Sequence, residues 1–225
     1  MKNSIAQAAV CLALASLALS ANAAGLTTSV SAGPTTNVVG ATTFDFGVTL
    51  PTNDSGPVSA LGSVTYNVAT YTGGELFNTA SAGVSGIAAR PVGSAGNFWS
   101  IEGGQTGTVS FATPVSYYGF LWGSPDAAGW NSVTFYHGNT LLGTFDGTVI
   151  SSSNAWTNTA YFNVSTGNGP SITSIAFSAN QNAFETDNHS FITAVPEPET
   201  YAMMLAGLGL LGFMSRRRKQ QQASA

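Results

Sequence analysis

The stretch GTVSFATPVSYYGFLW (107–122) decides the fold that the sequence predicts. Apolar and aromatic residues alternate along it with small polar ones, which is the pattern of a half-buried β-strand. Five other stretches share this character between turn residues: TTFDFGVTL (42–50), GSVTYNVATY (62–71), NSVTFYHG (131–138), NTAYFNVST (158–166) and SITSIAFSAN (171–180). From Thr27 to Thr193 we find no sustained helical period. The sequence therefore predicts an all-β body of about six to ten short strands, arranged as a β-sandwich of jelly-roll type.

A hairpin is the clearest local feature of this body. The stretch FYHGNTLLGTFDG (135–147) has two apolar runs separated by turn-forming residues. We therefore expect two antiparallel strands that are joined by a turn at His137 to Thr140.

The charges of the body narrow the kinds of partner that it can bind. Only 7% of the 225 residues are charged, against about 25% in typical proteins. Between Ala24 and Val195, eight acidic residues and the single base Arg90 give a net charge of −7. Such a body repels nucleic acid and suits cations or neutral partners such as sugars, although net charge also simply keeps a secreted protein soluble. The one cysteine, Cys11, precedes the body, which excludes disulfides and cysteine chemistry there.

The N-terminal segment MKNSIAQAAVCLALASLALSANAAG (1–25) is typical of a secretory signal peptide. Lys2 supplies the positive region, Ala8 to Leu19 form the apolar core, and ANA (21–23) is a small-x-small cleavage signal. We expect cleavage after Ala23 or Ala24, so that residues 1–24 are removed and the mature protein leaves the cytoplasm.

The C-terminal segment VPEPETYAMMLAGLGLLGFMSRRRK (195–219) has three distinct parts. An extended Pro-x-Pro element is followed by the apolar run Tyr201 to Phe213 and then by a basic cluster. A helix over this run would be about 20 Å long at 1.5 Å per residue, and a stable span needs about 20 residues. The segment therefore predicts a short transmembrane helix that serves as a transient inner-membrane anchor. The basic cluster would hold the tip in the cytoplasm.

This ending resembles the PEP-CTERM sorting signal of Gram-negative bacteria. The motif Pro196-Glu197-Pro198, the short apolar run and the cluster Arg216-Arg217-Arg218 match its three parts. The resemblance implies recognition by an exosortase, a membrane-embedded transpeptidase-like enzyme that cuts near the motif. Such processing is linked to exopolysaccharide and to biofilm or floc formation. The chain is then the substrate of the enzyme, released to the cell surface or the extracellular space, and it divides into a signal peptide (1–24), an ectodomain (25–194), a sorting signal (195–219) and a cytoplasmic tip (220–225).

Two stretches of the body could carry a binding site: LWGSPDAAGWNSVTFY (121–136) and NAFETDNHSFIT (182–193). Both are similar to stretches in the bodies of PEP-CTERM proteins. In an extended strand, Glu185 and Asp187 point to one face, where two carboxylates repel each other unless a cation or a donor intervenes. Oxygen ligands suit calcium, so Glu185, Asp187, Asn188 and Asp126 form a candidate structural calcium site. The alternative is that these acids are solvated or accept backbone N–H groups.

The aromatic residues offer a second kind of site. A Trp or Tyr ring can stack on the apolar face of a sugar while a neighbouring Asn or Asp bonds its hydroxyls. Most such rings in a β-sandwich belong to the core, and Trp122 lies in an apolar run that indicates burial. Trp130 lies between Gly129 and Asn131 in a predicted loop, so it is the candidate for saccharide stacking.

Catalysis has little support in the sequence. A glycosidase needs two carboxylates across a cleft, and no pair is marked. A serine triad needs a histidine, but His137 and His189 lack a GxSxG element. We therefore expect a non-enzymatic protein without a required cofactor, and the PEP-CTERM resemblance implies that it is a surface component of an extracellular polysaccharide matrix. A carbohydrate-binding module is the alternative, and an extracellular hydrolase is a third hypothesis.

Overall fold

The computed structural model describes residues 18–19, 25–47, 50–123, 125–126, 128–150, 159–194 and 204–211. The chain divides into one unit from Met1 to Thr193 and a second from Ala194 to Ala225. Most of the predicted signal peptide, the Pro-Glu-Pro motif and the arginine cluster lie outside the described residues.

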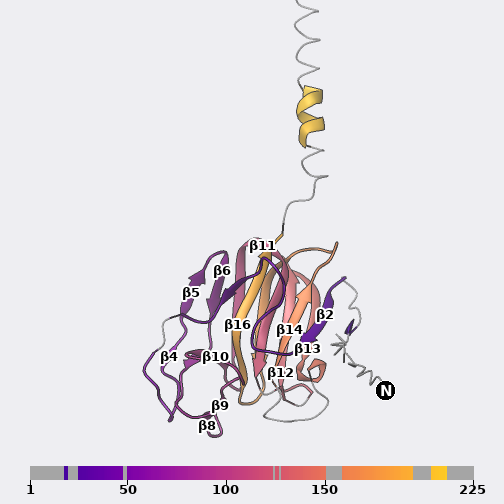
Figure 1. Ribbon diagram of the computed structural model, residues 1–225. Coiled ribbons are helices and arrows are strands. Elements are labelled where there is room, and N and C mark those ends of the chain that lie inside the picture. The colour runs from indigo at the N-terminus through magenta and orange to yellow at the C-terminus, as the bar shows by residue number, and fades with distance from the viewer. Residues whose placement is uncertain are drawn as a thin grey trace, which may run out of the picture. The chain divides into compact units, whose positions relative to one another are not determined.

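The first unit is built almost entirely from β-strands (Figure 1). Its strands are β1 (Ala18–Leu19), β2 (Thr27–Ser31), β3 (Thr42–Phe44), β4 (Ser59–Ala60), β5 (Ser63–Tyr66), β6 (Ala69–Thr72), β7 (Glu75–Phe77), β8 (Gly83–Val84), β9 (Ala88–Ala89), β10 (Phe98–Ile101), β11 (Thr106–Gly123), β12 (Asn131–His137), β13 (Thr140–Asp146), β14 (Ala160–Ser165), β15 (Ile172–Ala179) and β16 (Phe184–Thr193). A single 3₁₀ turn, η1 (Gly147–Val149), follows β13 in the described chain. The all-β prediction is confirmed, but the predicted strand number was too low because several strands have only two or three residues.

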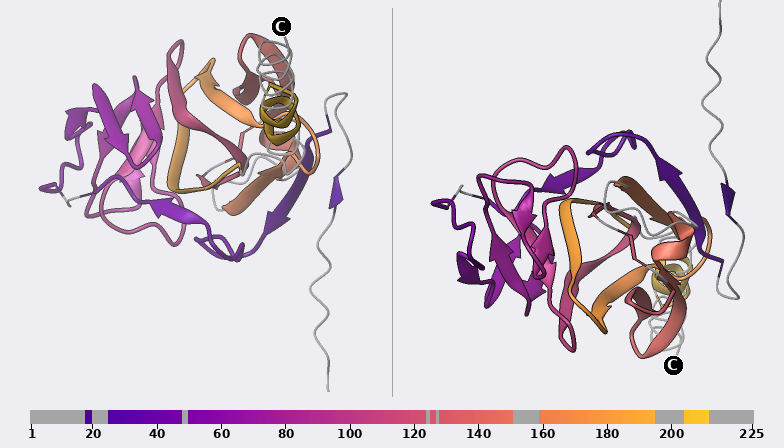
Figure 2. Two further views of the ribbon diagram at one scale, coloured as in Figure 1. Left: turned by 90° about the horizontal axis from the view of Figure 1, so that it is seen from above. Right: turned by 90° about the horizontal axis from the view of Figure 1, so that it is seen from below.

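Fourteen of the described strands form one antiparallel sheet, and β8 and β9 pair separately. Figure 2 shows the large sheet curling into a half-barrel rather than lying flat. The strand β11 makes this shape, because its two halves have different neighbours. Thr106 to Phe111 pair with β15 and β6, whereas Tyr117 to Gly123 pair with β14 and β16. The register shifts between Ser110 and Val115, around Pro114, which has no N–H to donate to a ladder.

The predicted strands match the structure closely where alternation is strongest. The stretch 107–122 lies within β11, and the stretches 131–138, 158–166 and 171–180 contain β12, β14 and β15. The hairpin prediction is also confirmed, since β12 and β13 pair around Gly138 and Asn139. Among its described residues, the stretch 42–50 forms only the three-residue strand β3, because Phe46 and Gly47 have positive φ angles of 57° and 78° that interrupt an extended chain.

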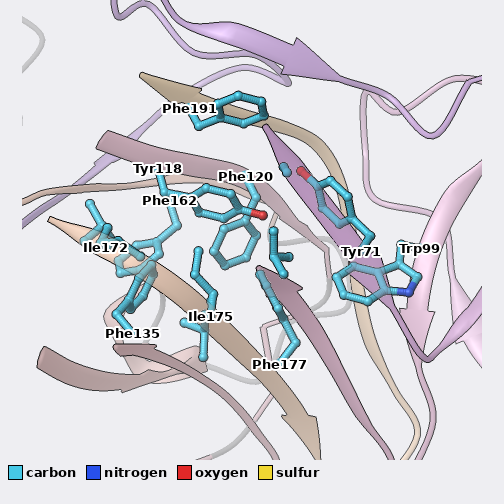
Figure 3. Packing of buried hydrophobic residues seen from close by; sticks show 14 of the residues in the cluster. Tyr71, Trp99, Tyr118, Phe120, Phe135, Phe162, Ile172, Ile175, Phe177 and Phe191 are labelled. Carbon is cyan, nitrogen blue, oxygen red and sulfur yellow. The ribbon is translucent and has the colours of Figure 1, made fainter. Parts of the chain in front are cut away.

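An aromatic core packs between the strands of the curled sheet (Figure 3). Strands far apart in the sequence contribute to it, among them β6, β10, β11 and β15. Trp122 is fully buried, as predicted, and stacks on Phe184 with ring centroids 4.6 Å apart. Burying rings of this size supplies most of the hydrophobic stabilisation of such a unit.

The second unit contains a helix at 204–211, within the predicted apolar run Tyr201 to Phe213. All eight of its residues are exposed. Within the described residues, no helix combines the length and the apolar character that crossing a membrane requires.

Candidate functional site

A pocket of about 710 Å³ opens on the first unit. One wall is the chain around the β8–β9 hairpin, from Ser81 to Arg90. Asp126, Trp130 and Glu185 also line the pocket, and Glu185 lies at the start of β16. The sequence marked Trp130 for saccharide stacking and the two acids for calcium, in separate hypotheses. The structure brings these three residues into one pocket.

Trp130 is held at this pocket by its backbone. It ends the turn before β12 and keeps 36% of its surface exposed. Asn180, just after β15, donates its backbone N–H to the Trp130 carbonyl oxygen at 2.7 Å and its Nδ2 to the Gly129 carbonyl oxygen at 2.6 Å. These two bonds fix the turn, so the indole is exposed on a segment with a defined position.

Asp126 is held from two sides. The Asn131 Nδ2 donates to Asp126 Oδ2 at 2.7 Å and to the Ala183 carbonyl oxygen at 2.9 Å. Behind it, a Cβ added at Gly147 would lie 2.5 Å from the Asp126 carbonyl oxygen, so this backbone approach requires a glycine. Partial burial raises the pKa of the Asp126 carboxyl to about 6, against the lowering effect of the Asn131 bond. The carboxyl is therefore fixed in position and titrates near neutral pH.

Glu185 links the large sheet to the pocket wall formed by residues 81–90. Its side chain is 2% exposed, and its Oε1 accepts a hydrogen bond of 2.7 Å from the Ala89 backbone N–H in β9. This contact ties the hairpin wall to β16. It also agrees with the alternative weighed from the sequence, in which an acid accepts backbone N–H groups.

Arg90 braces the same wall. Its Nη1 donates to the Gly96 carbonyl oxygen at 2.7 Å, and its Nη2 donates to Asn78 Oδ1 at 3.0 Å and to the Thr79 carbonyl oxygen at 2.8 Å. The guanidinium also lies 5.3 Å from the centre of the Phe98 ring. Arg90, the one basic residue of the body, therefore uses three of its N–H donors in hydrogen bonds within the protein.

Asp187 and Asn188 do not line this pocket. Asp187 Oδ2 accepts a bond of 2.6 Å from Ser94 Oγ, and its Oδ1 accepts the Asn188 backbone N–H at 2.7 Å. The Asn188 Nδ2 donates to the Pro34 carbonyl oxygen at 2.8 Å. Burial raises the pKa of the Asp187 carboxyl to about 7, although its hydrogen bonds oppose that rise. Both residues thus fasten loop residues onto β16.

The four residues of the calcium hypothesis are therefore divided between two places, and each has a partner in the protein. In the described part of the chain, no group of three or more His, Cys, Asp or Glu side chains could hold a metal ion. Asn131, which bonds Asp126 through its Nδ2, has a buried Oδ1 without a hydrogen-bond partner among the described residues. Calcium binding stays a prediction.

The two histidines lie in unrelated environments. His137, at the end of β12, donates its Nδ1–H to the Ser171 carbonyl oxygen at 2.7 Å. His189 is fully buried, contacts Tyr118 Oη through Nδ1 and lies 2.9 Å from Thr186 Oγ1 through Nε2. Burial lowers the pKa of His189 to about 3, so this imidazole is a neutral element of the core.

The sequence did not identify His189 as a core residue. The polar neighbours of His189, among them Asp187, are equally typical of an exposed strand end, so the sequence did not indicate burial. The signal that could have found it is Asn188, a residue type that tolerates positive φ and often marks a bulge.

Comparison with known proteins bears on the C-terminal segment. No curated protein and no solved structure matches the chain significantly. Residues 194–219 match the PEP-CTERM protein-sorting motif. The chain therefore carries this sorting motif at its C-terminus, which marks it as an exosortase substrate that is exported and sorted to the cell surface.

Proposed function

We propose that this protein is a non-enzymatic component of an extracellular polysaccharide matrix, as in a biofilm or a floc. The observation that carries the proposal is the sorting motif at residues 194–219. An exosortase substrate is handed over at the inner membrane, so the anchor is transient and the ectodomain acts outside the cell. Its role there would be delivery and adhesion rather than turnover.

The composition of the ectodomain supports this proposal. A net charge of −7 between Ala24 and Val195 keeps the released protein soluble, and the scarcity of lysine and arginine disfavours nucleic acid as its partner. The finer classification as a jelly-roll β-sandwich belongs with the proposal. It is supported by the way β11 pairs with different strands in its two halves around a shared aromatic core.

A carbohydrate-binding module is the second candidate function. The observation that favours it is the pocket in which Trp130, Asp126 and Glu185 meet. The third hypothesis, an extracellular hydrolase, would use the same two carboxylates as acid and base. Hydrolysis of a polysaccharide by the purified protein, lost in Asp126→Asn, would replace the non-enzymatic proposal with that one.

The test of the proposed function follows the protein in its host. The intact mass of the extracellular protein is measured in strains with and without the exosortase, together with the fraction retained by the isolated polysaccharide matrix. We expect a shortened protein in the matrix of the first strain and impaired release in the second. An extracellular protein that keeps its tail through Ala225 in both strains, or that is not retained by the matrix, contradicts the proposal.

A further inference from the structure

We propose that the pocket formed by Trp130, Asp126 and the wall from Ser81 to Arg90 binds a neutral sugar unit of an extracellular polysaccharide. This inference rests on the proposed function and names the ligand class of its candidate site. The indole of Trp130 supplies the stacking face, and the carboxylate of Asp126 accepts hydrogen bonds from sugar hydroxyls.

The shape of the site agrees with such a ligand. Its volume of about 710 Å³ lies in the range of pockets that enclose small organic ligands, about 300–1,000 Å³. Small and apolar side chains, among them Val84, Ile87 and Ala183, line it together with a few polar groups. Apolar lining with a few placed polar groups is what the C–H faces and the hydroxyls of a sugar ring require.

The site is also held in place before any ligand arrives. Asn180 fixes the turn that carries Trp130, and Asn131 fixes the carboxylate of Asp126. On the other wall, Arg90 and Asp54 secure the chain, since Asp54 Oδ1 accepts the Ala80 N–H at 2.8 Å. Groups that are already ordered lose little conformational entropy on binding, which favours affinity for a small ligand.

The charges of the pocket select against acidic sugars. Asp126 and Glu185 both line it, and the one cation of its wall, Arg90, donates three hydrogen bonds to its own chain. The carboxylate of a uronic acid would face the Asp126 carboxylate without a dedicated cation to pair with it. A neutral hexose has hydroxyl donors for the same carboxylate, so the pocket discriminates by charge as well as by shape.

The test measures binding of defined oligosaccharides to the exported protein purified from its host. The probes are the hexamers cellohexaose, maltohexaose and mannohexaose, with a hexamer of galacturonic acid as the acidic comparison, and binding is followed by isothermal titration calorimetry. We expect the wild type to bind at least one neutral hexamer and to bind the acidic one at least about tenfold more weakly.

Three pocket variants and two control variants locate the binding. Trp130→Ala should weaken binding of the neutral hexamer about tenfold or more, and Trp130→Phe, which keeps a ring, should stay within about threefold of the wild type. Asp126→Asn should weaken it about threefold to tenfold. The matched controls Leu141→Ala and Asp45→Asn change an exposed apolar residue and an exposed acid outside the pocket, and should bind as the wild type does. A thermal unfolding curve for each variant establishes that it is folded.

Three results would overturn this inference: no binding of any neutral hexamer, tighter binding of the acidic hexamer, or unchanged binding in folded Trp130→Ala and Asp126→Asn. The proposed function fails separately. If the protein is exported, cut and retained by the matrix while the pocket variants bind normally, only the pocket assignment is wrong. If the wild type is not retained by the matrix at all, the matrix role itself is wrong.

Discussion

His189 lies in a cage of aromatic rings inside the core. The rings of Phe46, Tyr71, Trp99, Tyr118, Phe120 and Phe177 have centroids 5.0–5.7 Å from the imidazole. A neutral imidazole donates through one nitrogen and accepts through the other, so it satisfies both Tyr118 Oη and Thr186 Oγ1. Its role is thus to pair two buried hydroxyls in an otherwise apolar environment.

Replacing this imidazole by an apolar side chain should destabilise the protein strongly. His189→Leu leaves two buried hydroxyls without their partner, and we expect it to lower the free energy of unfolding by about 2–5 kcal/mol in urea titrations. The control His137→Leu removes one exposed bond and should cost less than about 1 kcal/mol. The double variant with Thr186→Val should recover part of the loss, and equal stability of His189→Leu and wild type would contradict the interpretation.

Asp187 and His189 make the free energy of unfolding depend on pH in opposite directions. Its pKa is raised by burial to about 7 from an ordinary value of 3.8, so protonation favours the folded state, and its contribution is lost as the pH rises toward 7. His189, with its pKa lowered to about 3 from 6.5, makes stability fall as the pH drops below 6.5. The charged groups that act on Asp187 are Arg90 and Asp45, and they oppose each other.

The variant Asp187→Asn should separate these two contributions. Between pH 8 and pH 5, the wild type gains stability because Asp187 takes up a proton in the folded state, and the variant lacks this gain. The free energy of unfolding of the variant, relative to the wild type, should therefore fall by about 2 kcal/mol from pH 8 to pH 5. At pH 8 the variant should be at least as stable, because it no longer buries a charged carboxylate. Urea unfolding across this range is the measurement. Parallel profiles for the two proteins would show that Asp187 titrates as an exposed acid does.

The position of His189 shows why side-chain facing could not be predicted from alternation alone. Strict alternation would place Glu185, Asp187 and His189 on one face of a strand. In the structure, the pairing of β11 with β16 gains one residue on β16 between Asp187 and Ser190, and Asn188 has a φ of 49°. With this bulge, His189 faces the aromatic core, whereas Asp187 bonds the loop residue Ser94.

At the scale of elements, the segment from Asn78 to Asn97 has little regular structure, and its residues from Ser81 to Arg90 form one wall of the pocket. Its described strands, β8 and β9, have two residues each, so a short ladder alone cannot order it. Side chains supply the rest: Arg90 joins both ends of the segment, and Glu185 and Asp187 join it to β16.

Removing the Arg90 bonds should therefore loosen this wall before the rest of the sheet. In Arg90→Met, an apolar stem remains over Phe98 while three hydrogen bonds are lost. We expect hydrogen exchange in 79–97 to accelerate at least about tenfold, corresponding to about 1.4 kcal/mol of local stability, with β15 unchanged. Arg90→Lys, which keeps the charge but not the fork of donors, should be intermediate. An equal acceleration in β15 would mean that Arg90 stabilises the whole unit instead.

The elements themselves were predictable where the sequence is locally decisive. The stretch 107–122 alternates strongly and became β11, and the turn at Gly138 and Asn139 has the residues that a hairpin requires. The curl of the sheet was not predictable, because it depends on which strands pair with each half of β11. Those partners, β6 and β14, lie tens of residues before and after β11 in the sequence. Short-range sequence patterns do not indicate which distant strands pair. The pocket was beyond prediction for the same reason, since its two walls come from distant segments.

At the scale of the whole molecule, the candidate site and the sorting motif lie in different segments of the chain. The described residues of the first unit contain the core and the candidate site, while residues 194–219 contain the sorting motif. The charges follow the same division: the body is acidic, and four of the six basic residues lie between Arg216 and Lys219. An acidic body followed by a basic C-terminal cluster agrees with the orientation proposed above, in which the cluster stays in the cytoplasm while the body is exported.

Deleting residues 194–225 should therefore abolish sorting without changing the fold. The helical residues 204–211 are all exposed, and neither they nor Ala194, the other described residue of the second unit, belong to the aromatic core. The midpoint of thermal unfolding of the truncated protein should stay within about 2 °C of the full-length protein, since a change of 1 kcal/mol shifts it by about 2–4 °C in a domain of this size. In the host, the same deletion should remove membrane association and the processed product, which fractionation and intact mass would detect. A large drop in the unfolding midpoint would show that the sorting segment is part of the folded body. The interpretation of this segment as a removable sorting signal would then be wrong.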